Sequence, residues 1–199
     1  MKRRRGIVGA AAVVLSLALG GCAGGDYRDT SVPMRTEDHV DLSRYTGLWY
    51  EIARFPVWFE KNCTAVTARY ASRPDGKLTV VNSCHEGSPG GPLKMAEGIA
   101  RASGPSNARL EVSFVPWLPF AWGDYWMLDV NDDYSVAVIG VPSGDAGWIL
   151  ARAPHIPEDQ LDRSLAVLRA NGYDTSRIEM TTQPDGGSAP ADDKGGRRA

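Results

Sequence analysis

The stretch Gly47–Arg54 reads GLWYEIAR and places bulky apolar side chains on both faces of a predicted strand. A strand with one face in water alternates apolar and polar residues. Here Trp49 and Ala53 share one face, whereas Tyr50 and Ile52 share the other. The strand is therefore expected to be buried on both sides, with one face inside a β-structure and the other beneath a second layer.

Seven further runs of strand character follow at close spacing, separated by Gly, Pro, Asn and Asp. The eight predicted strands cover residues 47–55, 63–71, 77–84, 93–102, 108–115, 123–130, 134–141 and 146–153. This spacing is typical of an all-β sandwich or barrel. The sequence RPDG at residues 73–76 predicts a hairpin turn, and residues 177–182 are compatible with a further edge strand.

The apolar period changes after the eighth strand. A segment that opens at Pro157 and ends at Asn171-Gly172 is predicted to be a helix. Its apolar side chains form a stripe at helical spacing: Leu161, Leu165 and Leu168. An amphipathic helix must lie on an apolar surface, and the outer face with Tyr50 and Ile52 is the candidate.

The first 21 residues have the features of a secretory signal, because basic residues 2–5 precede an uncharged apolar run over residues 6–21. That run is short for a membrane span. It ends in Leu19-Gly20-Gly21-Cys22, which resembles the bacterial lipobox, where the cysteine becomes the acylated first residue of a lipoprotein. Several acyl chains such as palmitate on Cys22 would form a durable anchor. The alternative is an ordinary signal with small residues before its cleavage site.

The rest of the chain is predicted to have three parts. Residues 22–40 are polar and aperiodic, as in a lipidated tether, and residues 41–183 hold all six tryptophans of one domain. Residues 184–199 consist of Gly, Pro, charged and small residues and are predicted to be disordered. Ala23 stands where an Asp would favour inner-membrane retention, so we expect the protein at the outer membrane, facing the periplasm.

Charge and composition exclude several classes of partner. The chain has 22 Lys and Arg against 24 Asp and Glu, and the four basic residues of the signal leave 18 against 24 in the mature protein. Net charge therefore draws the protein neither to nucleic acid nor to anionic lipid. No group of His, Cys and Asp has metal-ligand spacing. The sequence predicts no metal and no cofactor.

Two motifs resemble those of the lipocalin family. Gly47-Leu48-Trp49 resembles its G-x-W signature, and residues 148–154, WILARAP, resemble its third motif, with Arg152 as the arginine. Within the family the chain is similar to the apolipoprotein D-like group of bacterial outer-membrane lipoproteins. The resemblance implies an eight-stranded antiparallel up-and-down barrel with a C-terminal α-helix packed outside. It also implies a carrier of small hydrophobic ligands.

The order of strands in such a barrel brings Trp49 and Arg152 together. Connections alternate between the two ends, so the start of the first strand neighbours the end of the last. A guanidinium over the indole contributes about 0.5–2 kcal/mol. We expect this pair to close one end of the barrel as a structural feature.

Aromatic residues are concentrated in two loops at the other end. They are Phe55, Trp58, Phe59, Trp117, Phe120 and Trp122. An exposed apolar collar of this kind indicates a ligand entrance, a membrane contact or a dimer surface. The alternative is that the rings fold over the barrel as a lid.

The barrel interior is expected to hold one small ligand. The predicted pocket residues are Glu51, Ala53, Phe55, Phe59, Tyr70, Phe114, Trp117, Phe120 and Trp148. Glu51 has the parity of Trp49, and an isolated buried carboxylate is costly. We expect it to pair with an inward arginine such as Arg69 or Arg101; the alternatives are that it is protonated or that water reaches it. It is also a candidate for orienting a ligand head group.

Cys63 and Cys84 remain once Cys22 is acylated, and an oxidising compartment favours their pairing. They flank the predicted hairpin, and direct opposition of the two would pair Tyr70 with Lys77. We therefore predict a disulfide. The alternative is a thiol nucleophile served by His85, but the sequence offers no third group to orient it.

These features predict a membrane-anchored carrier of fatty acids, lysophospholipids or similar lipids, serving membrane maintenance under stress in the bacterial envelope. No catalytic acid–base pair or triad has a recognisable spacing, so we predict no enzymatic activity. The alternatives are a lipocalin-scaffold enzyme that acts on a lipid and a homodimer formed through the aromatic collar.

Overall fold

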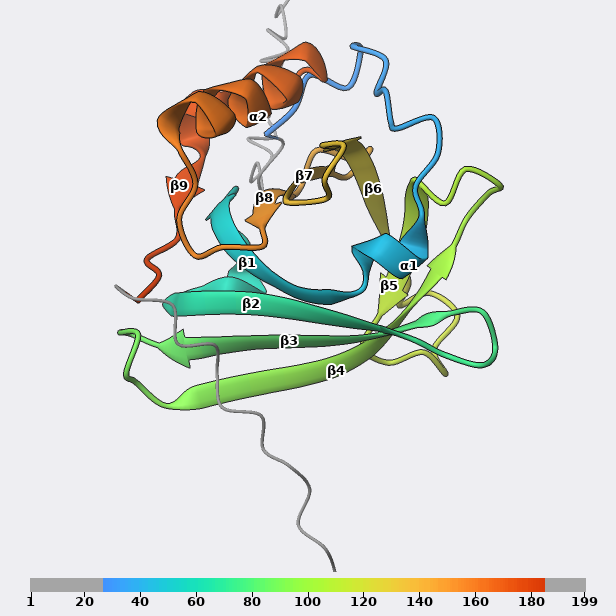
Figure 1. Ribbon diagram of the computed structural model, residues 1–199, viewed down its shortest axis with the longest axis horizontal. Coiled ribbons are helices and arrows are strands. Elements are labelled where there is room, and N and C mark those ends of the chain that lie inside the picture. The colour runs from blue at the N-terminus through green and yellow to red at the C-terminus, as the bar shows by residue number, and fades with distance from the viewer. Residues whose placement is uncertain (1–26, 185–199) are drawn as a thin grey trace, which may run out of the picture.

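The structure is a computed structural model and describes residues 27–184 (Figure 1). Its strands are β1 (Gly47–Arg54), β2 (Cys63–Ser72), β3 (Leu78–Glu86), β4 (Leu93–Ala102), β5 (Arg109–Ser113), β6 (Gly123–Val130), β7 (Val136–Gly140), β8 (Gly147–Ala151) and β9 (Glu179–Met180). Its helices are α1 (Leu42–Tyr45) and α2 (Glu158–Ala170), with 3-10 turns η1 (Trp58–Glu60) and η2 (Thr175–Arg177). The eight predicted barrel strands agree with these bounds to within two residues.

Strands β1 to β8 form a closed antiparallel up-and-down barrel. Each strand pairs with the next along the chain, and β8 pairs back with β1. The predicted barrel with a C-terminal helix outside it is therefore confirmed. The short β9 adds to the outer end of β1.

Helix α2 lies across the outside of the barrel, on the side away from β2, β3 and β4 (Figure 1). Glu158 and Asp159 occupy its first turn and Arg169 its last, which suits the helix dipole. The helix packs on β6 and β7, and Leu168 shares one buried cluster with Tyr50. This buried cluster is the second layer that was expected over the outer face of β1. Helix α2 contributes Leu168 to the cluster, although the helix itself packs on β6 and β7.

A β-bulge in β1 changes which side chains face inward. Glu51 lies opposite Leu150, but the next residue in register, Ala53, lies opposite Ile149, so Ile52 is the extra residue. One extra residue reverses the parity of everything beyond it. Arg54 consequently lies on the inner face of β1.

The barrel is closed at one end by α1, Trp49 and Arg152. The Arg152 guanidinium lies 3.8 Å from the Trp49 ring centroid and donates hydrogen bonds to backbone oxygens of Arg44 (2.8 Å), Tyr45 (3.2 Å) and other residues around it. Gly47 has φ +100°, and a Cβ there would lie 3.2 Å from Arg152 Nη1. The glycine of the signature therefore leaves room for the arginine.

Both flanking segments pack on the barrel. Tyr27 and Val40 are buried, and Arg28 forms a β-bridge with Tyr173. Residues 27–40 of the predicted tether therefore lie against the barrel, whereas residues 22–26 are outside the described residues. No helix within residues 27–184 combines the length and apolar character needed to cross a membrane.

Candidate functional site

A cavity of about 430 Å³ opens at the barrel end opposite Trp49. Its wall is largely apolar and aromatic: Val66, Ala68, Tyr70, Val80, Val112, Phe114, Trp122, Trp148 and Leu150. Several of these side chains lie two residues apart on one strand, as inward-facing residues must. The volume falls within the range of small-molecule sites.

Three tyrosine hydroxyls form a network between the cavity and the closed end. Tyr45 and Tyr125 hydroxyls are 2.7 Å apart, and the Tyr70 hydroxyl donates to that of Tyr125 at 2.9 Å. Burial raises the pKa of Tyr70 to about 12 and those of Tyr45 and Tyr125 well above their usual range. The floor of the cavity is therefore polar but uncharged at neutral pH.

Asn82 adds a second polar point to the cavity wall. Its amide oxygen is buried and has no hydrogen-bond donor among the described residues. Buried acceptors in proteins are nearly always satisfied. A ligand hydroxyl or a water molecule is the donor that this position calls for.

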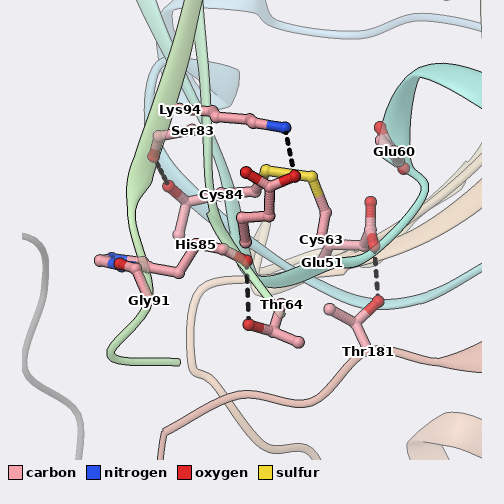
Figure 2. Close-up of a disulfide and its surroundings, with 12 residues drawn as sticks. Glu51, Glu60, Cys63, Thr64, Ser83, Cys84, His85, Gly91, Lys94 and Thr181 are labelled. Atoms are coloured by element: carbon pink, nitrogen blue, oxygen red, sulfur yellow. Dashed lines mark hydrogen bonds and ion pairs between the residues drawn. A yellow bond between two sulfur atoms is a disulfide. The ribbon is translucent and has the colours of Figure 1, made fainter. Parts of the chain in front are cut away.

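A buried charged cluster lies beside the cavity entrance. The Arg54 guanidinium contacts Glu51 at 2.8 Å and Glu60 at 3.5 Å, and the Trp148 indole N–H donates to Glu60 at 3.4 Å. The Thr181 hydroxyl donates a hydrogen bond to Glu51. Figure 2 shows that Glu51 lies close to the disulfide. The bulge in β1 makes this cluster, because it turns Arg54 to the face that carries Glu51.

Glu51 pairs with an inward-facing arginine, as expected, but this arginine is neither Arg69 nor Arg101. Arg69 lies opposite Leu48 and so has the outward parity. Arg101 pairs instead with Glu111 at 2.8 Å and stacks on Trp122. The cation at Glu51 is its neighbour Arg54, which the uninterrupted alternation of β1 would have placed outside.

One guanidinium faces two carboxyl groups in this cluster. Burial, and next the Glu51 charge, raise the pKa of Glu60 to about 8. A buried carboxyl group takes up a proton when its surroundings do not balance a charge. Glu60 therefore holds a proton at neutral pH and hydrogen-bonds to Glu51.

Glu60→Gln is expected to flatten the dependence of stability on pH. The pKa of Glu60 is raised from 4.5 to about 8, so folding takes up a proton between these values and stability falls as pH rises toward 8. The slope is at most about 1.4 kcal/mol per pH unit, or about 2 kcal/mol between pH 6 and pH 8. Urea unfolding of both proteins at pH 6, 7 and 8 measures the difference.

The exposed Glu158→Gln serves as the control, because it removes one carboxyl group outside the cluster. The slope of its unfolding free energy against pH should match that of the wild type. Identical slopes for Glu60→Gln and the wild type would show that Glu60 is already ionised at pH 6.

The structure separates the predicted pocket residues into two groups. Glu51, Phe59, Tyr70, Phe114 and Trp148 line the cavity. Four others do not: Ala53, Phe55, Trp117 and Phe120.

The four misplaced residues have two physical explanations. Ala53 and Phe55 belong to the buried cluster outside the barrel, where the bulge directs them, and Phe55 stacks on Tyr27 at 4.9 Å. Trp117 and Phe120 are exposed on the β5–β6 loop. The expected collar thus loses Phe55 to the outer cluster and Trp122 to the cavity wall, and keeps its four exposed loop residues.

Sequence reasoning missed Arg54, Glu60, Asn82 and Tyr125 at the site. Strand alternation could have indicated Tyr125 on β6 and Asn82 on β3, because each side chain points to the same face of its strand as the residue two positions away. Arg54 and Glu60 depend on a bulge and on a 3-10 turn. The sequence carried no local signal for either of these irregularities.

The structure contains a Cys63–Cys84 disulfide, with Cα atoms 5.4 Å apart (Figure 2). The predicted register was wrong, because Tyr70 lies opposite Val80 and Cys63 opposite Glu86. A register shift between Thr64 and Thr67 accounts for part of the difference. The disulfide therefore spans the hairpin diagonally, beside the cavity-lining Val66.

The thiol-nucleophile alternative is not supported by this geometry. Cys84 is in the disulfide, and the His85 ring nitrogen Nδ1 lies 2.8 Å from the Gly91 carbonyl oxygen. Within residues 27–184, no three His, Cys, Asp or Glu side chains gather as a metal site requires. The chemistry available at the cavity is apolar enclosure with a few neutral and charged hydrogen-bonding groups.

Comparison with known proteins gives concordant matches. The Lipocalin-like domain family model matches residues 40–183. Temperature-induced lipocalin-1 of Arabidopsis thaliana is 36% identical over 167 residues, which are 78% of this chain and 88% of that protein. Outer membrane lipoprotein Blc of Escherichia coli (strain K12) is 38% identical over 148 residues, 74% of this chain and 81% of that protein. Insecticyanin from the tobacco hornworm Manduca sexta superposes with a TM-score of 0.60 at 19% identity, over 77% of this chain and 86% of that chain.

Proposed function

Because the chain belongs to the lipocalin family, we propose that it is a lipid-anchored carrier that holds one acyl chain of a fatty acid, lysophospholipid or similar lipid. The observation that carries the proposal is the cavity of about 430 Å³, walled by apolar side chains and open at one end. Apart from Asn82 on the wall, its polar groups lie at the floor and the entrance, where the ends of an amphiphile would lie. No reacting pair of groups is needed for this role.

The energetics of burial favour such a ligand. An acyl chain that buries about 350 Å² of apolar surface gains roughly 9 kcal/mol before the costs of association. Those costs are several kcal/mol, so micromolar or tighter binding is expected. The buried amide oxygen of Asn82 favours a ligand that also carries a hydroxyl group.

Acylation at Cys22 would place the carrier at the outer membrane, facing the periplasm. Support comes from the lipobox-like LGGC at residues 19–22, which lie outside the described residues, and from relatives named outer membrane lipoprotein. A role in membrane maintenance under stress is in keeping with the relative named temperature-induced lipocalin. Mass spectrometry of the membrane-extracted protein tests the acylation directly.

Val112→Trp is expected to fill the cavity and weaken ligand binding by about 30-fold or more, since loss of most of the buried acyl area removes at least 2 kcal/mol. Val81→Trp is the matched control, because Val81 lies between Val80 and Asn82 on β3 and points away from the cavity. Delipidated protein titrated with a fluorescent fatty acid and with lysophospholipids gives the affinities. Absence of saturable uptake of every lipid by the wild type would refute the carrier function.

A further inference from the structure

Four of the exposed aromatic side chains lie in two loops at the open end of the barrel. Trp58 is 88% exposed and Phe59 54%, next to each other in η1, whereas Trp117 is 74% exposed and Phe120 83%, in the β5–β6 loop. We call these four residues the collar. Clustered exposed rings of this size mark a contact with a partner or a membrane. Tryptophan in particular favours the interface between lipid and water.

The N-terminal end of the described chain is fixed at this same end. The Tyr27 N–H donates to the Gly144 carbonyl oxygen at 2.9 Å, in the β7–β8 loop that borders the cavity. Its hydroxyl donates to the Pro56 carbonyl oxygen at 2.7 Å, in the β1–β2 loop next to Trp58. Tyr27 is therefore clamped between two loops of the open end.

The chain between Tyr27 and Cys22 limits the distance to a membrane. Cys22 lies five residues before Tyr27, and each residue spans at most about 3.6 Å, so the two are at most about 18 Å apart. Barrel strands of eight residues tilted by about 40° separate the two ends by about 20 Å before loops and side chains are added. An anchor at Cys22 thus cannot let the closed end rest on the membrane.

We propose that the open end of the barrel docks on the bilayer that holds the Cys22 anchor, with the collar in the lipid interface, so that a ligand passes between bilayer and cavity without entering water. This inference rests on the proposed acylation and carrier function. The collar supplies orientation, and the acyl chains supply most of the membrane affinity. The partner of the collar is therefore the lipid surface itself.

The position of the collar can be measured without any ligand. Mature protein acylated at Cys22 is placed in vesicles whose lipids carry bromine on the acyl chains, and tryptophan emission is compared with that in unbrominated vesicles. We expect the bromine to quench about one third of the emission, because two of six tryptophans lie in the collar. Trp58→Phe with Trp117→Phe should abolish this quenching, whereas the matched Trp126→Phe on β6 should retain it.

The rate of ligand transfer from vesicle to protein tests whether the ligand passes directly between bilayer and cavity. Replacing Trp58, Trp117 and Phe120 by Ser should slow transfer of a fluorescent fatty acid from vesicle to protein by about tenfold, because the open end no longer enters the interface. Affinity for the same fatty acid in bilayer-free solution should stay within about twofold of the wild type, because none of the three side chains lines the cavity.

Several outcomes would overturn docking, and they differ from failure of the carrier function. Unquenched collar tryptophans would exclude contact with the bilayer. Sedimentation of the membrane-reconstituted protein as a dimer with an unquenched collar would assign the collar to a second copy. An unmodified Cys22 in the mass spectrum would remove the tether. Loss of wild-type ligand affinity in solution, with quenching intact, would instead refute only the carrier function.

Discussion

Arg152→Ala is expected to destabilise the barrel by about 4 kcal/mol. The substitution removes the guanidinium over Trp49 and the donors to the Leu48 and Thr46 carbonyl oxygens, both at 2.8 Å. Hydrogen bonds to a charged donor contribute about 1.5–3 kcal/mol each, and the contact with the ring adds about 0.5–2 kcal/mol. Urea unfolding at pH 7, followed by tryptophan fluorescence, measures the loss.

Arg44→Ala is the matched control at the same end of the barrel. Arg44 stacks on Tyr134 at 4.1 Å and donates to the Asp132 carbonyl oxygen at 2.7 Å. Because both contacts are open to solvent, its removal should cost less than about 1 kcal/mol. Arg152→Lys should recover only part of the stability, because an ammonium group cannot reach several carbonyl oxygens at once. Equal losses for Arg152→Ala and Arg44→Ala would mean that the closed end is held by α1 packing alone.

Replacing both Cys63 and Cys84 by Ala is expected to lower the free energy of unfolding by about 3 kcal/mol. The disulfide joins residues separated by 21 positions, and loop closure of this length restricts the unfolded chain by roughly that amount. Because the bond lies at the end of the β2–β3 hairpin, near the cavity entrance, ligand affinity should also fall, though less than with Val112→Trp. Equilibrium unfolding in urea provides the stability value.

The free energy of unfolding of the reduced wild-type protein is measured for comparison. Its stability should match that of the double variant, because both lack the same covalent restraint. A double variant as stable as the oxidised wild type would show that the β2–β3 hairpin is already ordered in the unfolded ensemble without the disulfide. In that case the disulfide would be expected to act on the kinetics of unfolding alone.

The sequence predicted the architecture because the fold depends on regular patterns. Strand alternation, turn residues and the leucine stripe of α2 are all local, and each leaves a period that can be counted. The meeting of Trp49 and Arg152 follows from strand order alone, which bulges do not alter. These predictions needed no knowledge of side-chain orientation beyond the first residues of β1.

The site depends on departures from those patterns. Nothing in GLWYEIAR reveals that Ile52 is an extra residue, yet this bulge removes Ala53 from the cavity and brings Arg54 to Glu51. The register shift in β2 likewise accounts for one of the three positions by which the partner of Tyr70 differs from the predicted Lys77. The local cost of inserting one extra residue is small compared with the free energy of burying the side chains whose direction it changes. The position of a bulge therefore depends on packing in the whole barrel and not on the local sequence.

The seam between β1 and β2 has a consequence for biosynthesis. The two strands pair only from Gly47 to Tyr50 on the β1 side, and beyond that point Thr181 and Gln183 fill the gap: the Gln183 amide donates to the Glu51 and Val66 carbonyl oxygens at 2.8 and 2.9 Å. These residues leave the ribosome after every barrel strand. The wall of the container is thus completed only after translation of the domain has ended, because the residues that close the β1–β2 seam follow every barrel strand in the chain.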